Sequence, residues 1–224
     1  MLKKKKLIKV VFSTNILKTL YLNFHYFSFK DAIKFPILVS YRTVLETVGG
    51  GIDVKGKIHA GMLLLGYRGL AIVDGRYERT TWHVKGNLVL CGKVLLGRGT
   101  NLVIAEKGTC VFGDNFTITG RSTIICKKSI EFGANVLISW DVLFMDTDYH
   151  YIINNSNYVI NGDSPIFVGN NVWIGCRSLI KKGSKIPEGC IIAAGSTISG
   201  QLGKCNAIYG SERKLLRSDI SWYR

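Results

Sequence analysis

Residues 168–199 read VGNNVWIGCRSLIKKGSKIPEGCIIAAGSTIS, and an aliphatic residue returns at every sixth position of this stretch. The residues that set this period are Val168, Ile174, Ile180, Ile186, Ile192 and Ile198. A small residue often follows them, as at Gly169, Gly175, Ala193 and Ser199. A period of six fits neither an α-helix nor a lone strand. It indicates a short strand plus a corner, repeated many times.

The same period runs upstream through much of the chain. It connects three groups of apolar residues: Val84, Leu90, Leu96 and Leu102; Phe112, Ile118 and Ile124; and, after a slip, Phe132, Ile138 and Phe144. If each side contributes one apolar residue to a common interior, three sides make one coil of a triangular prism. Gly and Asn recur at the expected corners, and both tolerate left-handed backbone angles. We therefore expect an all-β fold of stacked, parallel coils.

The clearest repeats resemble the hexapeptide-repeat acyltransferases. The resemblance rests on residues 171–175 (Asn-Val-Trp-Ile-Gly), 192–196 (Ile-Ala-Ala-Gly-Ser) and 210–217 (Gly-Ser-Glu-Arg-Lys-Leu-Leu-Arg). It implies a left-handed parallel β-helix, an exception to right-handed crossover connections. The six-residue period alone does not give the handedness. The expected organisation is an N-terminal segment at 1–50, the β-helix domain at 51–210 with a protruding loop at 145–165, and a C-terminal tail at 211–224.

The N-terminal segment differs from the rest in composition. It is rich in Phe, Tyr, Leu and Lys and contains little Gly before residues 49–51. We expect a short helical or mixed structure that either contacts a membrane surface or packs on one end of the main domain. Lys9 and Lys18 interrupt its apolar run, and no small-residue cleavage site follows, so a signal peptide is not indicated. We expect a cytoplasmic protein, at the inner face of the membrane if this segment binds there.

Charge and cysteine content narrow the function classes. The formal net charge of +15 favours an anionic partner, without choosing among nucleic acid, membrane, polysaccharide and phosphorylated cofactor. Because no RNA-binding motif, helix-turn-helix or zinc finger is present, nucleic acid is not the expected partner. The 6 cysteines form no C-x-x-C pair, which indicates free thiols in a reducing compartment.

The repeat breaks after Phe144 and resumes at Val168. A loop that leaves a rigid solenoid is a usual place for function, because the coils hold it in position. This loop contains His150, which also matches the catalytic position of the family. The remaining histidines lie in the N-terminal segment or within or beside repeats: His25, His59 and His83.

Transfer of an acetyl group to a sugar hydroxyl needs a base. Imidazole titrates at a pH of about 6.5 and can take the proton of the hydroxyl as it attacks. We expect His150 to be this general base. Asp148, or alternatively Asp146, would accept a hydrogen bond from the ring and fix its tautomer. The alternative is that both carboxylates only make turn bonds.

The resemblance further implies acetyl-CoA as acyl donor, bound along the C-terminal coils between neighbouring subunits of a homotrimer. The positions that match the pantetheine site are Trp173, Cys176, Ser178 and Ala194. A plain interface aromatic is the alternative interpretation of Trp173.

The phosphates of CoA would meet basic residues near the C-terminus. Lys214 and Arg217 fall on the basic positions of the family's tail. Glu212 replaces the usual Pro of that tail. Ser199 stands at the first position of a Thr-Lys pair in the family, and its lysine is missing because Gly200 follows.

The expected function is therefore an acetyl-CoA-dependent O-acetyltransferase acting on a sugar or polysaccharide in capsular, exo- or lipopolysaccharide synthesis. One alternative is an N-acetyltransferase of an amino sugar. A second alternative, from another class, is a non-catalytic β-solenoid scaffold or binding protein. A zinc carbonic anhydrase would need about three imidazole ligands around an open metal site. The spacing of the 4 histidines supplies no such cluster, so no metal is expected.

Overall fold

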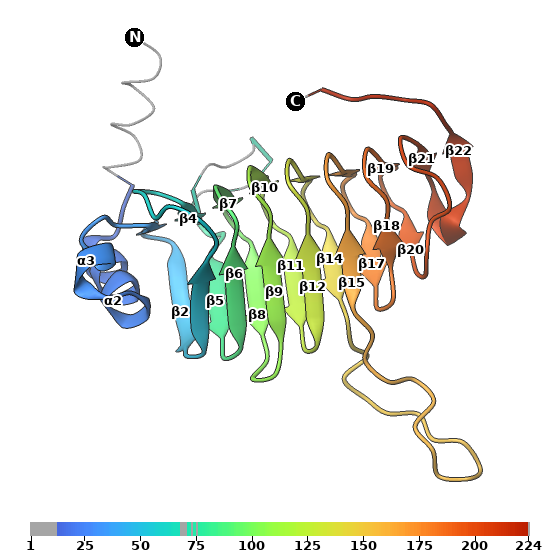
Figure 1. Ribbon diagram of the computed structural model, residues 1–224, viewed down its shortest axis with the longest axis horizontal. Helices are drawn as coiled ribbons and strands as arrows, with labels where there is room; N and C mark the ends of the chain where they lie inside the picture. Colours follow the sequence, from blue (N-terminus) through green and yellow to red (C-terminus); the bar gives the residue numbers. More distant parts are fainter. Residues whose placement is uncertain (1–12, 68–70, 73, 75, 224) are drawn as a thin grey trace.

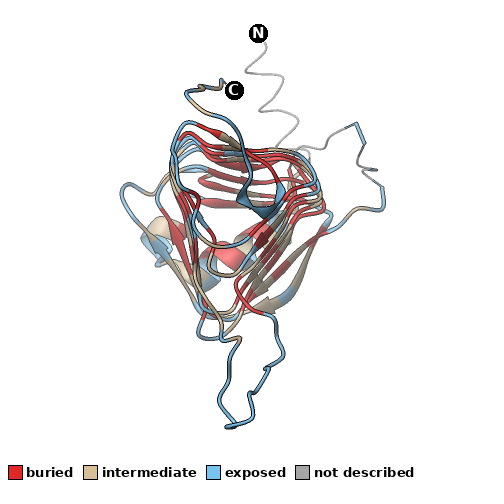
Figure 2. Cartoon of the chain, turned by 90° about the vertical axis from the view of Figure 1, so that its right-hand side faces the viewer, coloured by how far each residue is buried: buried red, intermediate tan, exposed pale blue. Residues whose placement is uncertain are grey.

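The computed structural model describes residues 13–67, 71–72, 74 and 76–223. Over these residues the chain winds into a long prism of three sheets, with two short helices at one end and a tail at the other (Figure 1). Seen along its axis the prism is triangular, and buried residues line its interior on all three sides (Figure 2). The expected all-β fold of stacked, parallel coils is confirmed.

The described strands fall into three sheets. The first sheet contains β1 (Ile37–Val39), β4 (Leu63–Leu65), β7 (Val94–Leu96), β10 (Phe116–Ile118), β13 (Leu137–Ile138), β16 (Trp173–Ile174), β19 (Ile191–Ile192), β21 (Ile208–Tyr209) and β22 (Leu215–Arg217). The second sheet contains β2 (Thr43–Val48), β5 (Thr80–Val84), β8 (Asn101–Ile104), β11 (Thr123–Cys126), β14 (Leu143–Met145), β17 (Leu179–Lys181) and β20 (Thr197–Ile198). The third sheet contains β3 (Gly51–Val54), β6 (Asn87–Leu90), β9 (Thr109–Phe112), β12 (Ser129–Phe132), β15 (Ile166–Val168) and β18 (Lys185–Ile186).

Each strand of the prism pairs in parallel with the equivalent strand one coil later. Ile124 of β11, for example, pairs with Leu102 of β8 on one side and with Phe144 of β14 on the other. The apolar residues that set the six-residue period are all buried, with at most 3% of their surface exposed. The period therefore identified the core correctly, because equivalent side chains of successive coils stack in one interior.

The corners between the third and first sheets use asparagine. Asn115, Asn135 and Asn171 have φ angles of 57°, 58° and 54°, in the left-handed region that Asn tolerates. Their side chains form a ladder, in which Asn115 donates to Asn135 at 2.9 Å and Asn135 donates to Asn171 at 3.1 Å. The expected corner chemistry is confirmed at these positions.

The N-terminal segment is helical where it is described, as α2 (Ile16–Tyr26) and α3 (Phe29–Ala32). Asn15 caps the start of α2 by accepting a hydrogen bond from the N–H of Lys18 at 3.0 Å. The described part of the segment then continues into strands, since β1 and β2 already pair with β4 and β5. The coils thus begin before the boundary expected at residue 51. The six-residue period does not extend back to the coil formed by β1, β2 and β3, because a long connection, residues 66–79, separates β4 from β5.

Within the described residues, no helix is long and apolar enough to cross a lipid bilayer. The cysteines are free thiols, and several of them replace aliphatic residues in the core: Cys110, Cys126 and Cys190. Burial raises the pKa of the Cys110 thiol well above its usual range, so this thiol acts as a small apolar side chain.

Candidate active site

Among the coils that set the six-residue period, the length of the connection varies at only one of the three corners. Apolar positions on either side of the other two corners are six residues apart, whereas the corner from the second to the third sheet is longer in three coils: Leu102 to Phe112, Ile124 to Phe132 and Phe144 to Val168. The longest of these connections is the expected loop, which leaves the prism between β14 and β15 (Figure 1). We call residues 146–165 the excursion.

The outer part of the excursion is a small hairpin. Ile153 and Val159 form an antiparallel bridge, and the N–H of Ile160 donates to the carbonyl of Ile152 at 2.9 Å. Residues 148–160 are all exposed, including large apolar side chains (Figure 2). The hairpin is therefore ordered by its own backbone, while its apolar surface lies open on the single chain.

Two lysines from the neighbouring coils hold the base of the excursion. Lys182, from the coil after it, donates to the Asp148 carboxylate on the outgoing limb and to the Asn161 carbonyl on the returning limb. Lys127, from the coil before it, binds the Tyr151 hydroxyl at 3.2 Å and the Asp163 carboxylate at 3.2 Å. The Tyr151 and Asp163 contacts together raise the pKa of Lys127. Both limbs are thus fixed to the rigid prism.

Asp146 has a structural role at the start of the excursion. Its carboxylate is buried and accepts hydrogen bonds from three backbone N–H groups, of Lys127 at 2.7 Å and of Lys128 and Ser129 at 2.8 Å each. Burial raises the pKa of this carboxyl, and the three N–H groups oppose that rise. Since both oxygens are used in closing the turn between β11 and β12, Asp146 does not orient His150.

His150 lies on the outgoing limb, between the two clamped positions, and is exposed. Its backbone N–H donates to the carbonyl of Asp148 at 2.7 Å, which makes a tight turn. Among the described residues, none forms a hydrogen bond with its ring. The backbone around the imidazole is therefore held, while the imidazole itself is open to solvent.

Asp148 does not form the contact that the sequence suggested. Its carboxylate binds Lys182 and the Asn161 amide, the latter at 3.0 Å, and the Lys182 contact above all lowers its pKa. The Asn161 amide also donates to the carbonyl of His150 at 2.8 Å. Asp148 thus fixes the backbone that carries His150, and no carboxylate among the described residues binds the ring.

A cavity of about 630 Å³ opens beside the excursion, on the side of the preceding coils. The residues that line it include Lys107, Lys127, Lys128, Tyr151 and Asp163. Tyr151 follows His150 directly, and the Lys127 ammonium lies 5.1 Å from the centre of its ring. The cavity therefore lies beside the residue that follows His150, and its lining carries three lysines and two carboxylates, those of Glu106 and Asp163.

The expected pantetheine positions lie in the coils that follow the excursion. Trp173 stands on the outer face of the first sheet with 38% of its surface exposed. Cys176 and Ala194 stack in successive corners between the first and second sheets, since the N–H of Gly195 donates to the Cys176 carbonyl at 2.8 Å. Ala194 is exposed and Cys176 is half-buried.

Ser178 differs from the other expected pantetheine positions. Its side chain is buried, and its hydroxyl donates to the carbonyls of Gly175 at 2.8 Å and Ala193 at 3.2 Å. A hydroxyl that already binds two carbonyls inside the prism is not available to a ligand on the surface. The side chain of Ser178 therefore closes a corner of the β-helix.

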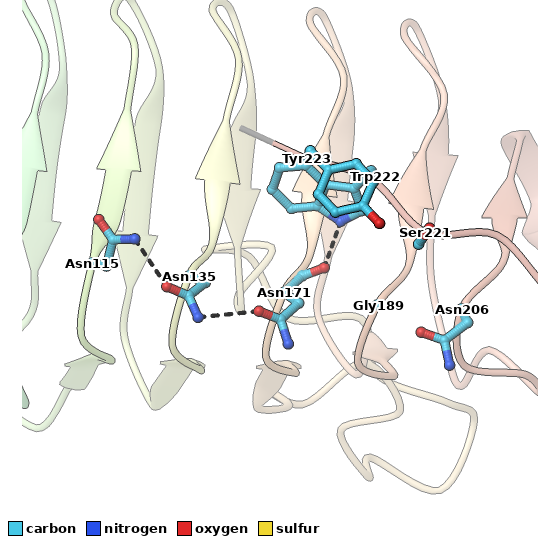
Figure 3. Close-up of a pocket in the computed structure, with 8 residues that line it drawn as sticks. All are labelled: Asn115, Asn135, Asn171, Gly189, Asn206, Ser221, Trp222 and Tyr223. Carbon is cyan, nitrogen blue, oxygen red and sulfur yellow. Dashed lines mark hydrogen bonds between the residues drawn. The ribbon is translucent and has the colours of Figure 1, made fainter.

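The C-terminal tail lies back over Trp173. The Trp222 indole is 6.1 Å from that of Trp173 and donates to the carbonyl of Asn171 at 2.6 Å. Trp222 and Tyr223 thereby border a pocket along the asparagine ladder, drawn in Figure 3. Sequence reasoning missed Trp222, because nothing in a linear pattern shows that the chain turns back over the preceding coils.

The basic tail takes a course of its own. Glu212 has φ 56°, which Pro cannot adopt, and this explains why the family's Pro is absent here. β22 then returns antiparallel to β21, with Lys214 and Arg217 exposed. Arg213 was not predicted. A Cβ atom placed on Gly200 would lie 3.2 Å from Nη1 of Arg213. The Arg213 guanidinium therefore lies next to the space that a side chain at position 200 would occupy.

Ser199 directly precedes Gly200, where the expected lysine is missing, and it is exposed at the corner after β20. The described chain therefore gathers the cations Arg213, Lys214 and Arg217 near the end of the prism. The described residues contain no group of three or more His, Cys, Asp or Glu that would hold a metal ion.

Comparison with known proteins agrees with this geometry. Residues 165–200 match the family model of the bacterial transferase hexapeptide (six repeats). The galactoside O-acetyltransferase of Escherichia coli is 33% identical over 89 residues, which are 39% of this chain and 43% of that protein. An uncharacterized 24.8 kDa protein in the cps region of Klebsiella pneumoniae is 28% identical over 139 residues, 62% of this chain and 61% of that protein. The chain spans about two to three fifths of the length of the curated relatives it matches.

Among solved structures, the polySia specific acetyltransferase NeuO superposes with a TM-score of 0.58 at 17% sequence identity. The match covers 82% of this chain and 89% of that chain, and it shows a shared fold. The hexapeptide match and this common architecture confirm the resemblance stated from the sequence. They identify the fold as a left-handed parallel β-helix of hexapeptide repeats.

Proposed function

We propose that this protein transfers an acetyl group from acetyl-CoA to a sugar hydroxyl in the synthesis of a surface polysaccharide. The observation that carries the proposal is the setting of His150, an exposed imidazole on an excursion whose two limbs are clamped to the prism. A relative that acetylates a galactoside and a relative from a cps region support this substrate class.

His150 acts as general base in direct transfer. It accepts the proton of the acceptor hydroxyl while that oxygen attacks the thioester carbonyl carbon. A C–O bond forms, the C–S bond breaks, and the proton passes from the imidazole to the departing thiolate of CoA. Because this thiolate is a far better leaving group than an alkoxide, no acyl-enzyme is needed.

Acetyl-CoA binds along the coils after the excursion. Trp173, Cys176 and Ala194 offer an exposed face and corner for the pantetheine arm. The cations Arg213, Lys214 and Arg217 then meet the CoA phosphates, where fixed positive charge is most useful. In this arrangement Arg213 replaces the cation that the family carries at position 200.

The working form is a homotrimer. The outer hairpin of the excursion exposes Ile152, Ile153, Tyr158, Val159 and Ile160, each with more than half of its surface accessible. Contiguous exposed apolar side chains of this kind mark a protein contact. A neighbouring subunit that covers the hairpin would also enclose the space around His150, and would exclude water from the reaction.

The surface of the N-terminal helices supports a contact with the inner face of a membrane. On α2 the buried face is mixed, since Thr19, Leu22 and Asn23 face the prism, and the outer face carries apolar side chains such as Leu17, which is 79% exposed. Phe29 of α3 is 73% exposed, and Lys30 and Lys34 lie exposed on the same segment. Apolar and aromatic side chains flanked by lysines are the composition that binds an anionic lipid surface.

The decisive experiment supplies the purified protein with acetyl-CoA and a panel of glycans, and measures CoA release together with the acetylated product. An O-acetyl ester on a sugar is the expected product. An N-acetyl product on an amino sugar would replace this function by the alternative reaction. A protein that neither binds CoA nor transfers acetyl to any acceptor would be a β-solenoid scaffold.

A further inference from the structure

One corner of the prism carries lysines in successive coils. The turns that lead from the second to the third sheet contain Lys85, Lys107, Lys127, Lys128 and Lys182, and Lys181 ends β17 just before the last of these turns. Outside the excursion, Glu106 is the single acid in these turns among the described residues. Because stacked strands lie about 4.8 Å apart, the lysines form a row along the corner from which the excursion emerges. Such a row creates a positive potential that attracts anions.

The excursion neutralises only part of this row. The carboxylates of Asp148 and Asp163 are already paired with Lys182 and Lys127. Lys128 donates to the main-chain carbonyl of Asp163 at 3.3 Å, which supplies no opposite charge. The row therefore keeps uncompensated cations on the side of the coils that precede the excursion.

These cations line the cavity beside His150. Lys107 and Lys128 come from two successive coils, and Tyr151, the residue after His150, contributes the aromatic part of the lining. The volume of about 630 Å³ is within the range of sites for small molecules, about 300–1,000 Å³. The two ammonium groups suit an anionic group on a sugar residue. The aromatic ring beside them suits the C–H face of the same sugar residue.

The two sides of the excursion have different ligands. Under the proposed function, acetyl-CoA occupies the coils after the excursion, where the cations of the tail meet its phosphates. The cavity on the preceding coils remains for the acceptor. Its polar lining is cationic, apart from Glu106 and the already paired Asp163.

We infer that the acceptor is an acidic glycan, whose carboxylate or phosphate binds Lys107 and Lys128 while a neighbouring hydroxyl faces His150. This inference rests on the proposed function and narrows its substrate class. Lys127, already held by Tyr151 and Asp163, positions the cavity wall. The row of lysines beyond the cavity binds further acidic residues of the same chain.

The test compares Lys107→Ala/Lys128→Ala with the wild type on three acceptors: a carboxylated oligosaccharide, a phosphorylated oligosaccharide and a neutral one of equal length. We expect the KM for the preferred acidic acceptor to rise at least about tenfold, as expected for loss of a charge-assisted contact. Lys107→Arg/Lys128→Arg should restore most of this loss. The KM for acetyl-CoA should not change.

The matched control is Lys55→Ala/Lys93→Ala. It removes the same charge from exposed lysines at another corner of the prism and should leave all constants unchanged. Higher ionic strength should raise the KM for the acidic acceptor in the wild type more than in the double variant. The comparison of the two acidic acceptors shows which anionic group the cavity takes.

Two results would overturn the inference. One is a wild type that acetylates the neutral acceptor as efficiently as the acidic ones. The other is a double variant that loses activity equally on all three acceptors. Failure of the proposed function itself would look different, because then no acceptor would be acetylated and acetyl-CoA would not bind.

Discussion

At the scale of single residues, His150 derives its role from its surroundings. Its backbone is held through Asp148 and Asn161, and these are tied to the prism by Lys182. Since Lys182 lowers the pKa of Asp148, this contact is present above the ordinary pKa of a carboxyl and is lost only as the pH falls through the lowered value. The clamp is therefore intact throughout the neutral range, in which an imidazole changes its charge.

His150→Ala should remove the base and leave the fold intact, because the residue is exposed and outside the core. Turnover should fall by about 10²–10⁴-fold, the usual contribution of a general base. The affinity for acetyl-CoA and the melting temperature should stay near the wild-type values. His150→Asn should be equally poor, since an amide does not take up the proton. Turnover within a few-fold of the wild type would remove His150 from the mechanism.

Asp146→Ala tests the structural role assigned to that carboxylate. It would leave three backbone N–H groups at the turn of residues 127–129 without their acceptor. The free energy of unfolding should fall by about 1–3 kcal/mol, the cost of unsatisfied buried donors. Chemical denaturation measures this change. Asp53→Ala, which removes an exposed carboxylate, is the control and should have little effect. An unchanged stability in Asp146→Ala would contradict the assignment.

Arg213→Ala tests the cation that the sequence did not predict. If its guanidinium meets the CoA phosphates, the KM for acetyl-CoA should rise about tenfold, and less if solvent screens the contact. The KM for the acceptor should be unaffected. Lys204→Ala, an exposed lysine at the same end of the prism, is the matched control. Equal constants in both variants would show that Arg213 does not bind the donor.

The sequence predicted site residues where the repeat made them visible. His150 stood out because it falls where the six-residue phase is lost. For Ser178 the phase gives the position in the coil, but does not show that the hydroxyl binds two carbonyls. Lys182 and Arg213 were missed as partners, since their contacts depend on how far the excursion and the tail fold back over the coils.

At the scale of elements, α2 buries two polar side chains beside Leu22 on the face that meets the prism. The Asn23 side chain accepts from the N–H of Ile37 at 3.0 Å and donates to its carbonyl at 2.7 Å, and Thr19 accepts from the N–H of Val39 at 3.1 Å. The helix thus satisfies the open edge of β1 with polar side chains. An exposed edge strand would otherwise pair with another chain. Leu22 joins the core, while other apolar side chains of α2, such as Leu17 and Phe24, face outward.

This arrangement of side chains on α2 bears on whether the N-terminal segment contacts a membrane or packs on one end of the main domain. A helical pattern alone predicts that the apolar face packs inward. The structure shows a mixed inward face, because α2 buries Leu22 in the core and also meets the unpaired backbone groups of β1, which polar side chains satisfy. The segment does cover one end of the prism, and its outer face is free for a second contact.

Leu17→Ser/Phe24→Ser should abolish binding to anionic membranes. We expect the wild type to float with vesicles of phosphatidylglycerol and phosphatidylcholine, and to bind pure phosphatidylcholine more weakly, because lysines contribute to the contact. The double variant should stay unbound and keep its activity on soluble acceptors. Ile72→Ser/Tyr77→Ser, which changes exposed apolar residues elsewhere, is the control. Equal flotation of both variants, or self-association through α2 in place of vesicle binding, would refute the membrane contact.

At the scale of the whole molecule, the prism joins a rigid core with projecting parts that are not covered. The period predicted the core because every coil repeats the same inward contact. It did not predict the course of the excursion or of the tail, which have no repeat. The excursion exposes apolar side chains on its hairpin, residues 152–160, and the tail lies beside the exposed Trp173. A closed assembly of identical subunits would cover such surfaces.

The oligomeric state tests this argument. Sedimentation of the wild type at micromolar concentration should show a trimer. Ile153→Ser/Ile160→Ser should shift it to monomers, because these side chains are 58% and 62% exposed in the single chain and would be buried against the neighbour. The folded structure should persist in the variant, since neither residue belongs to the core. Turnover should fall with the trimer even though His150 is intact, because the neighbour completes the site around it. Lys57→Ala, a change on an exposed turn at the opposite end of the prism, should alter neither property. A wild type that is monomeric and fully active would show that the exposed hairpin has another partner and that one chain suffices for catalysis.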